Sequence, residues 1–341
     1  MADRPFRFGV LSTAKIGREL VIPAIGRASN ATVTAIASRS EKHARALADR
    51  VGAPHAFGSY EALLESPEVD GVYVPLPTSM HVEWALAAAR AGKHVLVEKP
   101  LALKAKDIEP LIRARDERGV VVSEAFMVVY HPQWAKVREL LAKGAVGTLR
   151  RIEASFSYFN VDARNMRNRP ELGGGALPDI GVYPTVAARF ATGREPERVR
   201  ASVELDPGFG TDRHASVQVD FGGAESDVGG GVEMSFYVST QLAARQGIVF
   251  HGDEGFVELA APFNSNLYEG DEVRLHDRRH SEVRTFRYVG VDQYALEVEA
   301  FAVAARTGDA SAVFSLEDSV RNQRVIDAAY RSGRTGRWEK V

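Results

Sequence analysis

A lysine stands at the end of a short apolar run, between an acid and a proline. Residues 94–97, His-Val-Leu-Val, have the pattern of a buried strand, and Glu98, Lys99 and Pro100 follow directly. In open α/β sheets ligands bind outside the carboxyl ends of the strands, and a proline ends the strand's hydrogen bonding. We therefore predict that Lys99 presents its charge to a ligand crevice. The alternative is a surface lysine that follows a buried strand.

The first strand runs into a turn that suits a phosphate group. The pattern Ser12-x-Ala14-x-x-Gly17 occupies the place of a Gly-x-Gly-x-x-Gly loop. Such a loop brings a helix N-terminus close to a pyrophosphate. Serine and alanine can serve there if their φ angles are negative, so we predict that this turn binds a dinucleotide through Ser12, Thr13, Ala14, Ile16 and Gly17. An ordinary strand-to-helix turn is the alternative.

The second strand ends in Ser38-Arg39-Ser40, where an NAD-binding chain usually has an acid that accepts from the ribose 2'-hydroxyl. A guanidinium with neighbouring hydroxyls suits a 2'-phosphate, because charge-assisted hydrogen bonds form there. We therefore predict NADP(H) as the cofactor in preference to NAD(H). The alternative is that Arg39 is a solvated residue at a helix start.

Composition excludes several classes of protein. The 341 residues carry a formal net charge of -2, which gives no electrostatic reason to expect nucleic acid or an anionic membrane as a partner. The chain has no cysteine, the histidines lack close metal-ligand spacing, and no apolar run approaches the roughly 20 residues that span a bilayer. We predict a cytoplasmic protein without a metal site, a nucleic-acid partner or a membrane partner.

The elements that must position these residues alternate along the first third of the chain. This rhythm predicts a doubly wound parallel sheet of the Rossmann type, with strands near 6–11, 32–37, 71–74, 94–97 and 120–125 and helices near 16–28, 41–51, 79–91 and 104–118. We predict a cofactor-binding domain over residues 1–125.

The rest of the chain follows a different pattern. A helix near 133–142 and a long alternating strand over 149–159 precede many strands joined by short turns, which predicts a large, mostly antiparallel sheet. Two late helices are expected, near 294–306 and 316–331; Ser315 and Asp318 form a capping-box pattern at the second. Residues 126–341 are predicted to be an α+β domain that binds substrate and supports oligomerisation.

The chain resembles the glucose-fructose oxidoreductase, inositol dehydrogenase and MocA family of NAD(P)-dependent sugar and polyol dehydrogenases. The resemblance runs nearly end to end, and its branch is that of the aldose and dimeric dihydrodiol dehydrogenases. It rests on the turn at 9–17 and on the segments Tyr73 to His81, Gly92 to Pro100, Glu124 to Met127 with His131-Pro132, Gly173 to Tyr183 and Tyr330 to Gly336.

The resemblance implies the roles of the site residues. Lys99 matches the family's active-site lysine, and Asp179 and Tyr183 match a downstream pair. Tyr183 would be the general base in alcohol oxidation, Lys99 would lower its pKa and orient the hydroxyl, and Asp179 would position the substrate. Spacing alone places 179 and 183 on one face of a short helix, which Pro184 complicates. The alternatives are that Tyr183 is a tyrosine of the core and that Asp179 is an acid at the start of a helix.

Other positions follow from the same resemblance. We expect further cofactor contacts from Pro75, Leu76, Pro77, His81 and Glu98. Met127 and His131 are candidate substrate contacts, although a lone histidine at a helix entrance also suits a structural role. Val128 and Val129 stand where related chains often have an aromatic residue and an arginine, which puts the sugar preference in question.

Three functions compete. The first is an NADP-dependent aldose 1-dehydrogenase or the reverse reduction of a carbonyl, the second a trans-diol or inositol dehydrogenase, and the third a cofactor-binding regulatory protein without turnover. The presence of Lys99, Asp179 and Tyr183 argues against the third. The resemblance also implies a homodimer or higher homo-oligomer formed through the C-terminal sheet.

Overall fold

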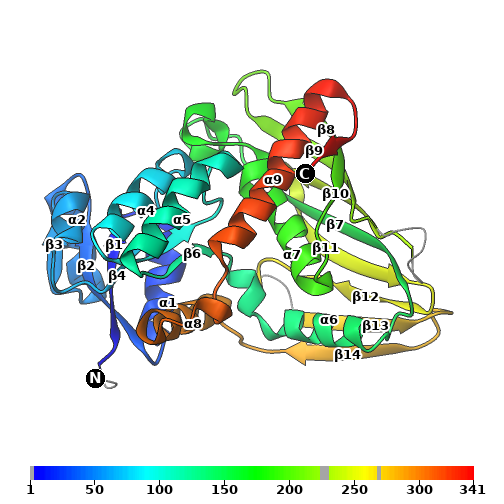
Figure 1. The fold of residues 1–341 in the computed structure, drawn as a ribbon, viewed down its shortest axis with the longest axis horizontal. Helices are drawn as coiled ribbons and strands as arrows, with labels where there is room; N and C mark the ends of the chain where they lie inside the picture. Colours follow the sequence, from blue (N-terminus) through cyan, green and yellow to red (C-terminus); the bar gives the residue numbers. More distant parts are fainter. Residues whose placement is uncertain (1–3, 223–229, 267–269) are drawn as a thin grey trace. The chain divides into compact units, whose positions relative to one another are not determined.

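The computed structural model describes residues 4–222, 230–266 and 270–341, which form two compact units. The first comprises Met1–Tyr130 and Asp292–Val320, and the second His131–Val291 and Arg321–Val341. The division therefore lies five residues after the expected boundary at 125, and a late segment returns to the first unit (Figure 1).

The first unit has a parallel sheet of six strands in the order β3-β2-β1-β4-β5-β6, which confirms the predicted doubly wound fold. Its elements are β1 (Phe6–Leu11), η1 (Gly17–Val21), α1 (Ile22–Arg27), β2 (Ala31–Ala37), α2 (Glu41–Val51), β3 (His55–Phe57), α3 (Tyr60–Leu64), β4 (Gly71–Val74), η2 (Thr78–Met80), α4 (His81–Arg90), β5 (His94–Glu98), η3 (Ala105–Ile108), α5 (Glu109–Arg118), β6 (Val122–Ala125), η4 (Met127–Tyr130), α8 (Gln293–Thr307) and η8 (Ala310–Ala312).

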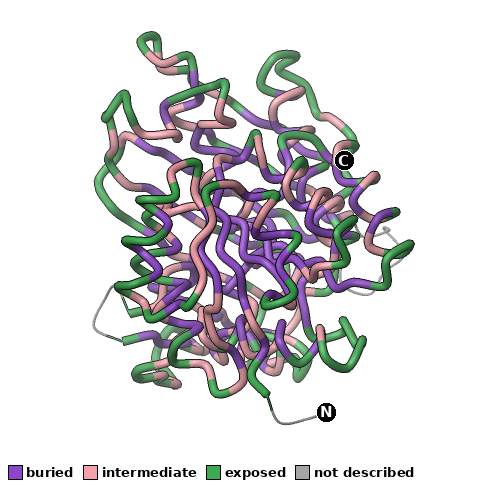
Figure 2. The backbone as a smooth tube through the Cα atoms, turned by 90° about the vertical axis from the view of Figure 1, so that its left-hand side faces the viewer, coloured by how far each residue is buried: buried purple, intermediate pink, exposed green. Residues whose placement is uncertain are grey.

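The strands at the centre of this sheet are buried on both faces, as their apolar runs predict. Every residue of β4 is buried, and Figure 2 shows the central strands in purple between helices that alternate purple and green. Helix α8 belongs to this unit because its Phe301 ring lies 5.9 Å from Phe6 and 5.7 Å from Phe8 of β1. No local pattern in the sequence indicates that a helix so late in the chain completes the first core.

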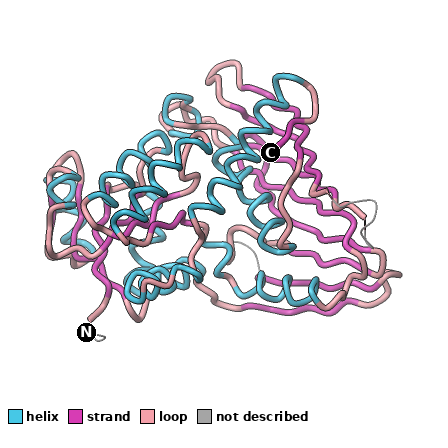
Figure 3. The backbone as a smooth tube through the Cα atoms, in the orientation of Figure 1, coloured by secondary structure: helices cyan, strands magenta, loops and turns pink. Residues whose placement is uncertain are grey.

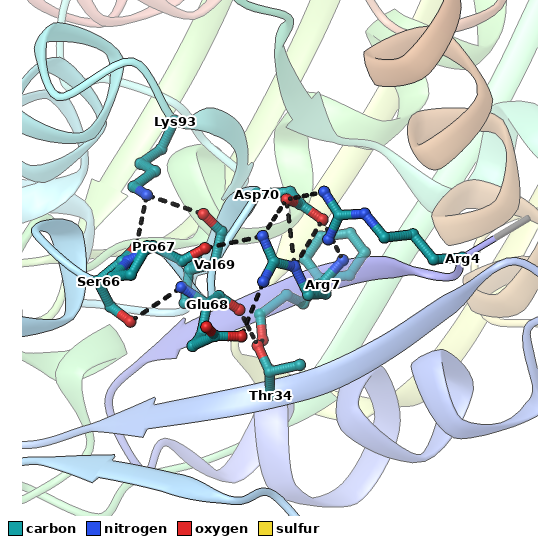
Figure 4. A network of polar contacts seen from close by, with 10 residues as sticks. Arg4, Arg7, Thr34, Ser66, Pro67, Glu68, Val69, Asp70 and Lys93 are labelled. Carbon is teal, nitrogen blue, oxygen red and sulfur yellow. Dashed lines mark hydrogen bonds and ion pairs between the residues drawn. The ribbon is translucent and has the colours of Figure 1, made fainter. Parts of the chain in front are cut away.

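Charged side chains stabilise the edge of the parallel sheet at which its strands begin. The Asp70 carboxylate, just before β4, accepts from the backbone N–H of Arg7 at 2.9 Å and from its Nη2 at 2.8 Å (Figure 4). Lys93, just before β5, donates through Nζ to the carbonyls of Ser66 and Val69 at 2.7 and 2.8 Å. These contacts tie β1, β4 and β5 together at the edge opposite the expected crevice.

The second unit has a sheet of nine strands in the order β14-β13-β12-β11-β7-β10-β9-β8-β15. All its strand pairs are antiparallel except β7 with β10, which confirms a mostly antiparallel sheet. Its strands are β7 (Leu149–Phe159), β8 (Arg198–Leu205), β9 (Asp212–Asp220), β10 (Glu233–Ser239), β11 (Gln241–Gly252), β12 (Gly255–Leu259), β13 (Asp271–Asp277), β14 (Val283–Tyr288) and β15 (Glu339–Lys340).

Helices of the second unit gather on one face of this sheet (Figure 3). They are α6 (Pro132–Ala142), η5 (Met166–Asn168), η6 (Pro170–Leu172), η7 (Leu177–Gly181), α7 (Val182–Thr192) and the greater part of α9 (Leu316–Thr335). The capping box at the start of α9 is confirmed, since Asp318 N donates to Ser315 Oγ at 3.0 Å. Gly333 lets α9 approach β8, because a Cβ there would lie 2.7 Å from Val203 Cγ2.

Candidate active site

Lys99 follows β5 at the carboxyl edge of the parallel sheet and lies near two carboxyl groups. Glu98 accepts from the Tyr73 hydroxyl at 2.7 Å and from the Lys99 backbone N–H at 3.2 Å. Glu124, buried in the neighbouring β6, accepts from Leu101 N at 2.8 Å. Burial raises the pKa of Glu124 to about 7, and hydrogen bonds and the Lys99 charge oppose that rise. Lys99 therefore stands beside an acid that can titrate near neutrality.

The turn after β1 differs from the expectation of negative φ angles. Ser12 has φ +123°, a conformation that L-residues other than glycine rarely adopt and that costs about 1–3 kcal/mol. Hydrogen bonds hold it there: Ser12 N donates to Ala37 O at 2.9 Å, and its Oγ donates to Pro75 O at 3.1 Å and accepts from Ala14 N at 3.2 Å. The serine thus joins the turn after β1 to the turn after β4.

The predicted cofactor residues of the first unit meet at one place in the sheet. Strands β1 and β4 are neighbours although β2 and β3 lie between them in sequence, so the sheet changes its winding direction there. Such a switch point is where doubly wound sheets bind nucleotides. Pro75, Leu76 and Pro77 follow β4, and Gly17 lies close to this loop, since a Cβ on it would be 3.5 Å from Pro75 Cγ.

The end of β2 fits a phosphate-bearing ribose. Ser38, Arg39 and Ser40 follow this strand directly; Arg39 is exposed, and its charge opposes the rise that burial causes in the pKa of Tyr60. No acid occupies positions 38–40. A positive potential with two hydroxyls at this strand end suits a 2'-phosphate better than a free 2'-hydroxyl.

His81, predicted as a cofactor contact, uses both ring nitrogens within its own unit. The ring is buried, with Nδ1 2.8 Å from Pro100 O and Nε2 2.7 Å from Leu76 O. Burial lowers the pKa of His81 to about 4, and the two carbonyls oppose that effect. The side chain therefore ties the loop after β4 to the turn that carries Lys99.

In the second unit, Asp179 and Tyr183 lie on a helix whose start is fixed by a buried carboxylate. Leu177 N donates to Asp212 Oδ2 at 2.7 Å, and Gly175, with φ +134°, packs so closely that a Cβ would lie 2.0 Å from Asp212 Oδ1. Burial raises the pKa of Asp212 to about 6. The close approach at Gly175 is therefore to a protein carboxylate.

Strand β7 supports both residues of the pair. Phe156 and Tyr158, two positions apart on one face of the strand, meet Tyr183 and Asp179, four positions apart on the helix. The rings of Phe156 and Tyr183 are 5.6 Å apart, and the Tyr158 hydroxyl donates to Asp179 Oδ2 at 2.5 Å. Arg167 Nε donates to the same oxygen at 2.8 Å.

Models of the glucose-fructose oxidoreductase family match both units. The model for an oxidoreductase family with an NAD-binding Rossmann fold matches residues 6–126, and that for the GFO/IDH/MocA C-terminal domain matches residues 134–258. The chain belongs to the Gfo/Idh/MocA family of oxidoreductases. It is accordingly an oxidoreductase with an NAD(P)-binding Rossmann fold.

Relatives within the Gfo/Idh/MocA family span the whole chain. A D-xylose 1-dehydrogenase (NADP(+)) of Haloferax volcanii is 38% identical over 331 residues, 96% of this chain and 98% of the relative. A dTDP-3,4-didehydro-2,6-dideoxy-alpha-D-glucose 3-reductase of Actinomadura kijaniata is 35% identical over 97% of this chain and 96% of its own length. The crystal structure of KijD10, a 3-ketoreductase from that organism with NADP and TDP-benzene, has a TM-score of 0.86 at 32% identity and covers 96% of this chain and 98% of its own.

The two candidate substrate residues, Met127 and His131, are each buried within their own unit. Met127 is buried in η4 of the first unit. His131 is buried in the second unit; its Nδ1 accepts from Gln133 N at 3.2 Å and its Nε2 lies 3.3 Å from Asp271 Oδ2. His131 is therefore the N-cap residue of α6. The neighbouring Val128 is also buried.

Sequence reasoning missed the neighbours of the candidate residues, which are Tyr158, Arg167 and Asp212 in the second unit and Glu124 in the first. The alternation of β7 indicates that Phe156 and Tyr158 share a face, but no pattern connects Arg167 or Asp212 with position 179. Within residues 4–222, 230–266 and 270–341, no three His, Asp or Glu side chains are grouped to hold a metal ion. No helix in the described part of the chain is long and apolar enough to cross a membrane.

Proposed function

We propose that this chain is an NADP-dependent oxidoreductase of the aldose 1-dehydrogenase type, which acts on a CH–OH carbon of a sugar or polyol. The observation that carries the proposal is the 38% identity to a D-xylose 1-dehydrogenase across nearly the full length of both chains. The carboxylate of Asp179 and the hydroxyl of Tyr183 are groups that suit a substrate rich in hydroxyls.

The cofactor would be held by the first unit. The turn at Ser12 to Gly17 would approach the pyrophosphate. Arg39, Ser38 and Ser40 would bind the 2'-phosphate. The loop at Pro75 to Pro77, together with Glu98 and Lys99, would contact the nicotinamide end. NADP(H), when bound, accepts or supplies the hydride. Replacing Arg39 by Asp should weaken NADP binding about tenfold or more and leave NAD binding less affected. Equal losses in fluorescence titrations with the two cofactors would remove Arg39 from this role.

The proton would be moved at the hydroxyl of Tyr183. A tyrosine has an ordinary pKa of about 10 and accepts a proton at neutral pH only if positive charge favours its phenolate. We assign Lys99 to the same reaction, as a cation that orients the reacting oxygen. Supporting this pair, solved variants of KijD10 replace a tyrosine and a lysine that are as many residues apart as Lys99 and Tyr183.

The test is NADP+ reduction followed at 340 nm against aldoses, inositols and trans-diols, with NAD+ in parallel. Turnover of aldoses, with product trapped as the acid formed from the lactone, supports the proposal. Turnover of inositols or trans-diols alone would replace it with the dehydrogenase of that class. Binding of NADPH without turnover in either direction would favour a non-catalytic protein.

Reduction of a keto sugar is the second candidate, favoured by the full-length similarity to dTDP-sugar 3-reductases at 35–37% identity. The same residues serve in reverse, with Tyr183 donating the proton to the carbonyl oxygen. Oxidation of NADPH by a keto sugar, faster than the oxidation of any aldose by NADP+, would establish this direction.

We further propose that a second copy of the chain covers the helix-free face of the nine-stranded sheet. Outward side chains of its central strands line a hollow on this face, among them Arg200, Ser216, Ser235, Tyr237 and Arg245. Light scattering after size exclusion should show a dimer or larger assembly, and Tyr237→Asp should reduce it to monomer. An unchanged assembly in that variant would place the interface elsewhere.

A further inference from the structure

The cluster around Asp179 raises an electrostatic problem for the proposed base. Asp179 and Tyr183 are four residues apart along the η7–α7 helix and lie on neighbouring sites of one face. A carboxylate in that position disfavours a phenolate on Tyr183, because like charges repel. Some cation must offset Asp179 if Tyr183 is to accept a proton.

Arg167 is the cation of this unit that does so. Its Nε is 2.8 Å from Asp179 Oδ2, and the Asp179 side chain is only 11% exposed. The Asp179 charge raises the pKa of the guanidinium, against the opposing effect of burial. The Arg167 charge therefore offsets the carboxylate charge that would otherwise disfavour a phenolate on Tyr183.

Tyr158 has a different part in the cluster. Burial raises its pKa, and the negative charge of Asp179 raises it further. It therefore remains a phenol and donates to Asp179 Oδ2 at 2.5 Å. Tyr158 therefore fixes the Asp179 carboxylate.

We propose that Arg167 is a positioning residue that holds Asp179 and, by cancelling its charge, favours the phenolate of Tyr183. This inference rests on the proposed function of Tyr183 as the base. The titratable and charged groups of the second unit in this cluster are, with their partners, Arg167, Asp179, Tyr158, Asp212 and Tyr330. Lys99 belongs to the first unit.

The test measures the ionisation of Tyr183 in the full chain without substrate. Ultraviolet difference titration near 295 nm, with the Tyr183→Phe spectrum subtracted, reports this phenol alone. Arg167→Gln should move the titration upward by about one pH unit or more, since an opposite charge typically shifts a neighbour by 1–3 units. Asp179→Asn should move it downward, and Arg167→Gln with Asp179→Asn should return it toward the parent value.

Controls separate charge from folding. Arg167→Lys retains the charge and should keep most of the parent titration. Arg164→Gln removes a nearby arginine that is 90% exposed and pairs with Asp162, so the titration should not move.

Identical titrations for the parent and Arg167→Gln, both folded by circular dichroism, would overturn the inference. This readout needs no turnover, so it stands apart from the substrate assays. If Tyr183 titrates as proposed and no sugar reacts, the proposed function fails and the electrostatic role of Arg167 remains. If sugars react and the titration ignores Arg167, the reverse holds.

Discussion

Each unit of the chain contains an arginine–aspartate pair at 2.8 Å, and the two pairs have different surroundings. Arg7 and Asp70 lie at the amino edge of the parallel sheet, where further donors from Arg7 and Arg4 converge on the same carboxylate (Figure 4). Arg167 lies in η5 and Asp179 in η7, and the hydroxyl group of Tyr158 donates to the same carboxylate.

These two ion pairs are of the same chemical type but lie in different surroundings. Donors from the backbone and from arginines, which do not release protons near neutrality, surround Asp70, so its contacts can only hold strands together. The Asp179 pair adjoins a phenol whose proton affinity depends on the local charge. In our proposal, the Arg167–Asp179 pair acquires a chemical role because a titratable group stands beside it.

The largest expected effect concerns the phenol at the second pair. Tyr183→Phe removes the proposed proton acceptor and should reduce kcat about 100-fold or more, the usual contribution of general acid–base catalysis. The melting temperature and NADPH affinity should change little, because the ring keeps its contacts with Phe156 and Phe263. Stopped-flow or steady-state assays measure kcat, and retained turnover would assign the proton step to another group.

Replacing Asp70 by Asn should lower the stability and leave the activity unchanged, which is the opposite of the result expected for Tyr183→Phe. The amide cannot accept from Arg7 as a carboxylate does, and we expect a loss of about 2 kcal/mol in the free energy of unfolding, since one partner of a partly buried pair is left unmatched. Denaturant unfolding gives this value, and kcat should be unchanged. A large loss of activity in the folded variant would join this edge of the sheet to catalysis.

The same variant tests the pH dependence of the first pair. Burial alone would raise the pKa of Asp70, but hydrogen bonds and charge from Arg7, with the Arg4 charge, hold it below its ordinary value. The stability from its ionised form is therefore present above about pH 4 and is lost as the pH falls through the folded pKa. The parent and Asp70→Asn should differ constantly from pH 5 to 8 and converge in more acidic solution.

A smaller effect is expected at the carboxyl edge of the same sheet. Ser12→Ala keeps the positive φ and loses both hydroxyl hydrogen bonds, which should cost about 1 kcal/mol or more. Ser12→Gly loses the same bonds but relieves the backbone, so it should be the more stable of the two. The reverse order in thermal unfolding would show that Ser12 is not strained.

The smallest effect should come from Arg4, which is 63% exposed. Arg4→Ala removes an exposed partner of Asp70 and should lower the free energy of unfolding by about 0.5 kcal/mol, an amount that high salt should abolish. A loss as large as that of Asp70→Asn would mean that the first pair depends on Arg4 as much as on Arg7.

Local patterns in the sequence determined much of the architecture. The buried apolar runs predict the parallel strands, the alternation over 149–159 predicts β7, and the Ser315–Asp318 box predicts the start of α9, because each depends on neighbours within a few residues. The same locality places Lys99 and Arg39 at strand ends, since a strand's carboxyl end is visible in its own sequence.

The tertiary structure alone decided what depends on distant residues. It made α8 part of the first core, gave Ser12 a positive φ, and engaged His81 with two backbone carbonyls. It also brought Arg167 to Asp179. Those contacts are set by how strands and helices pack, and a side chain's partner, charge balance and proton affinity follow from that packing rather than from its neighbours along the chain.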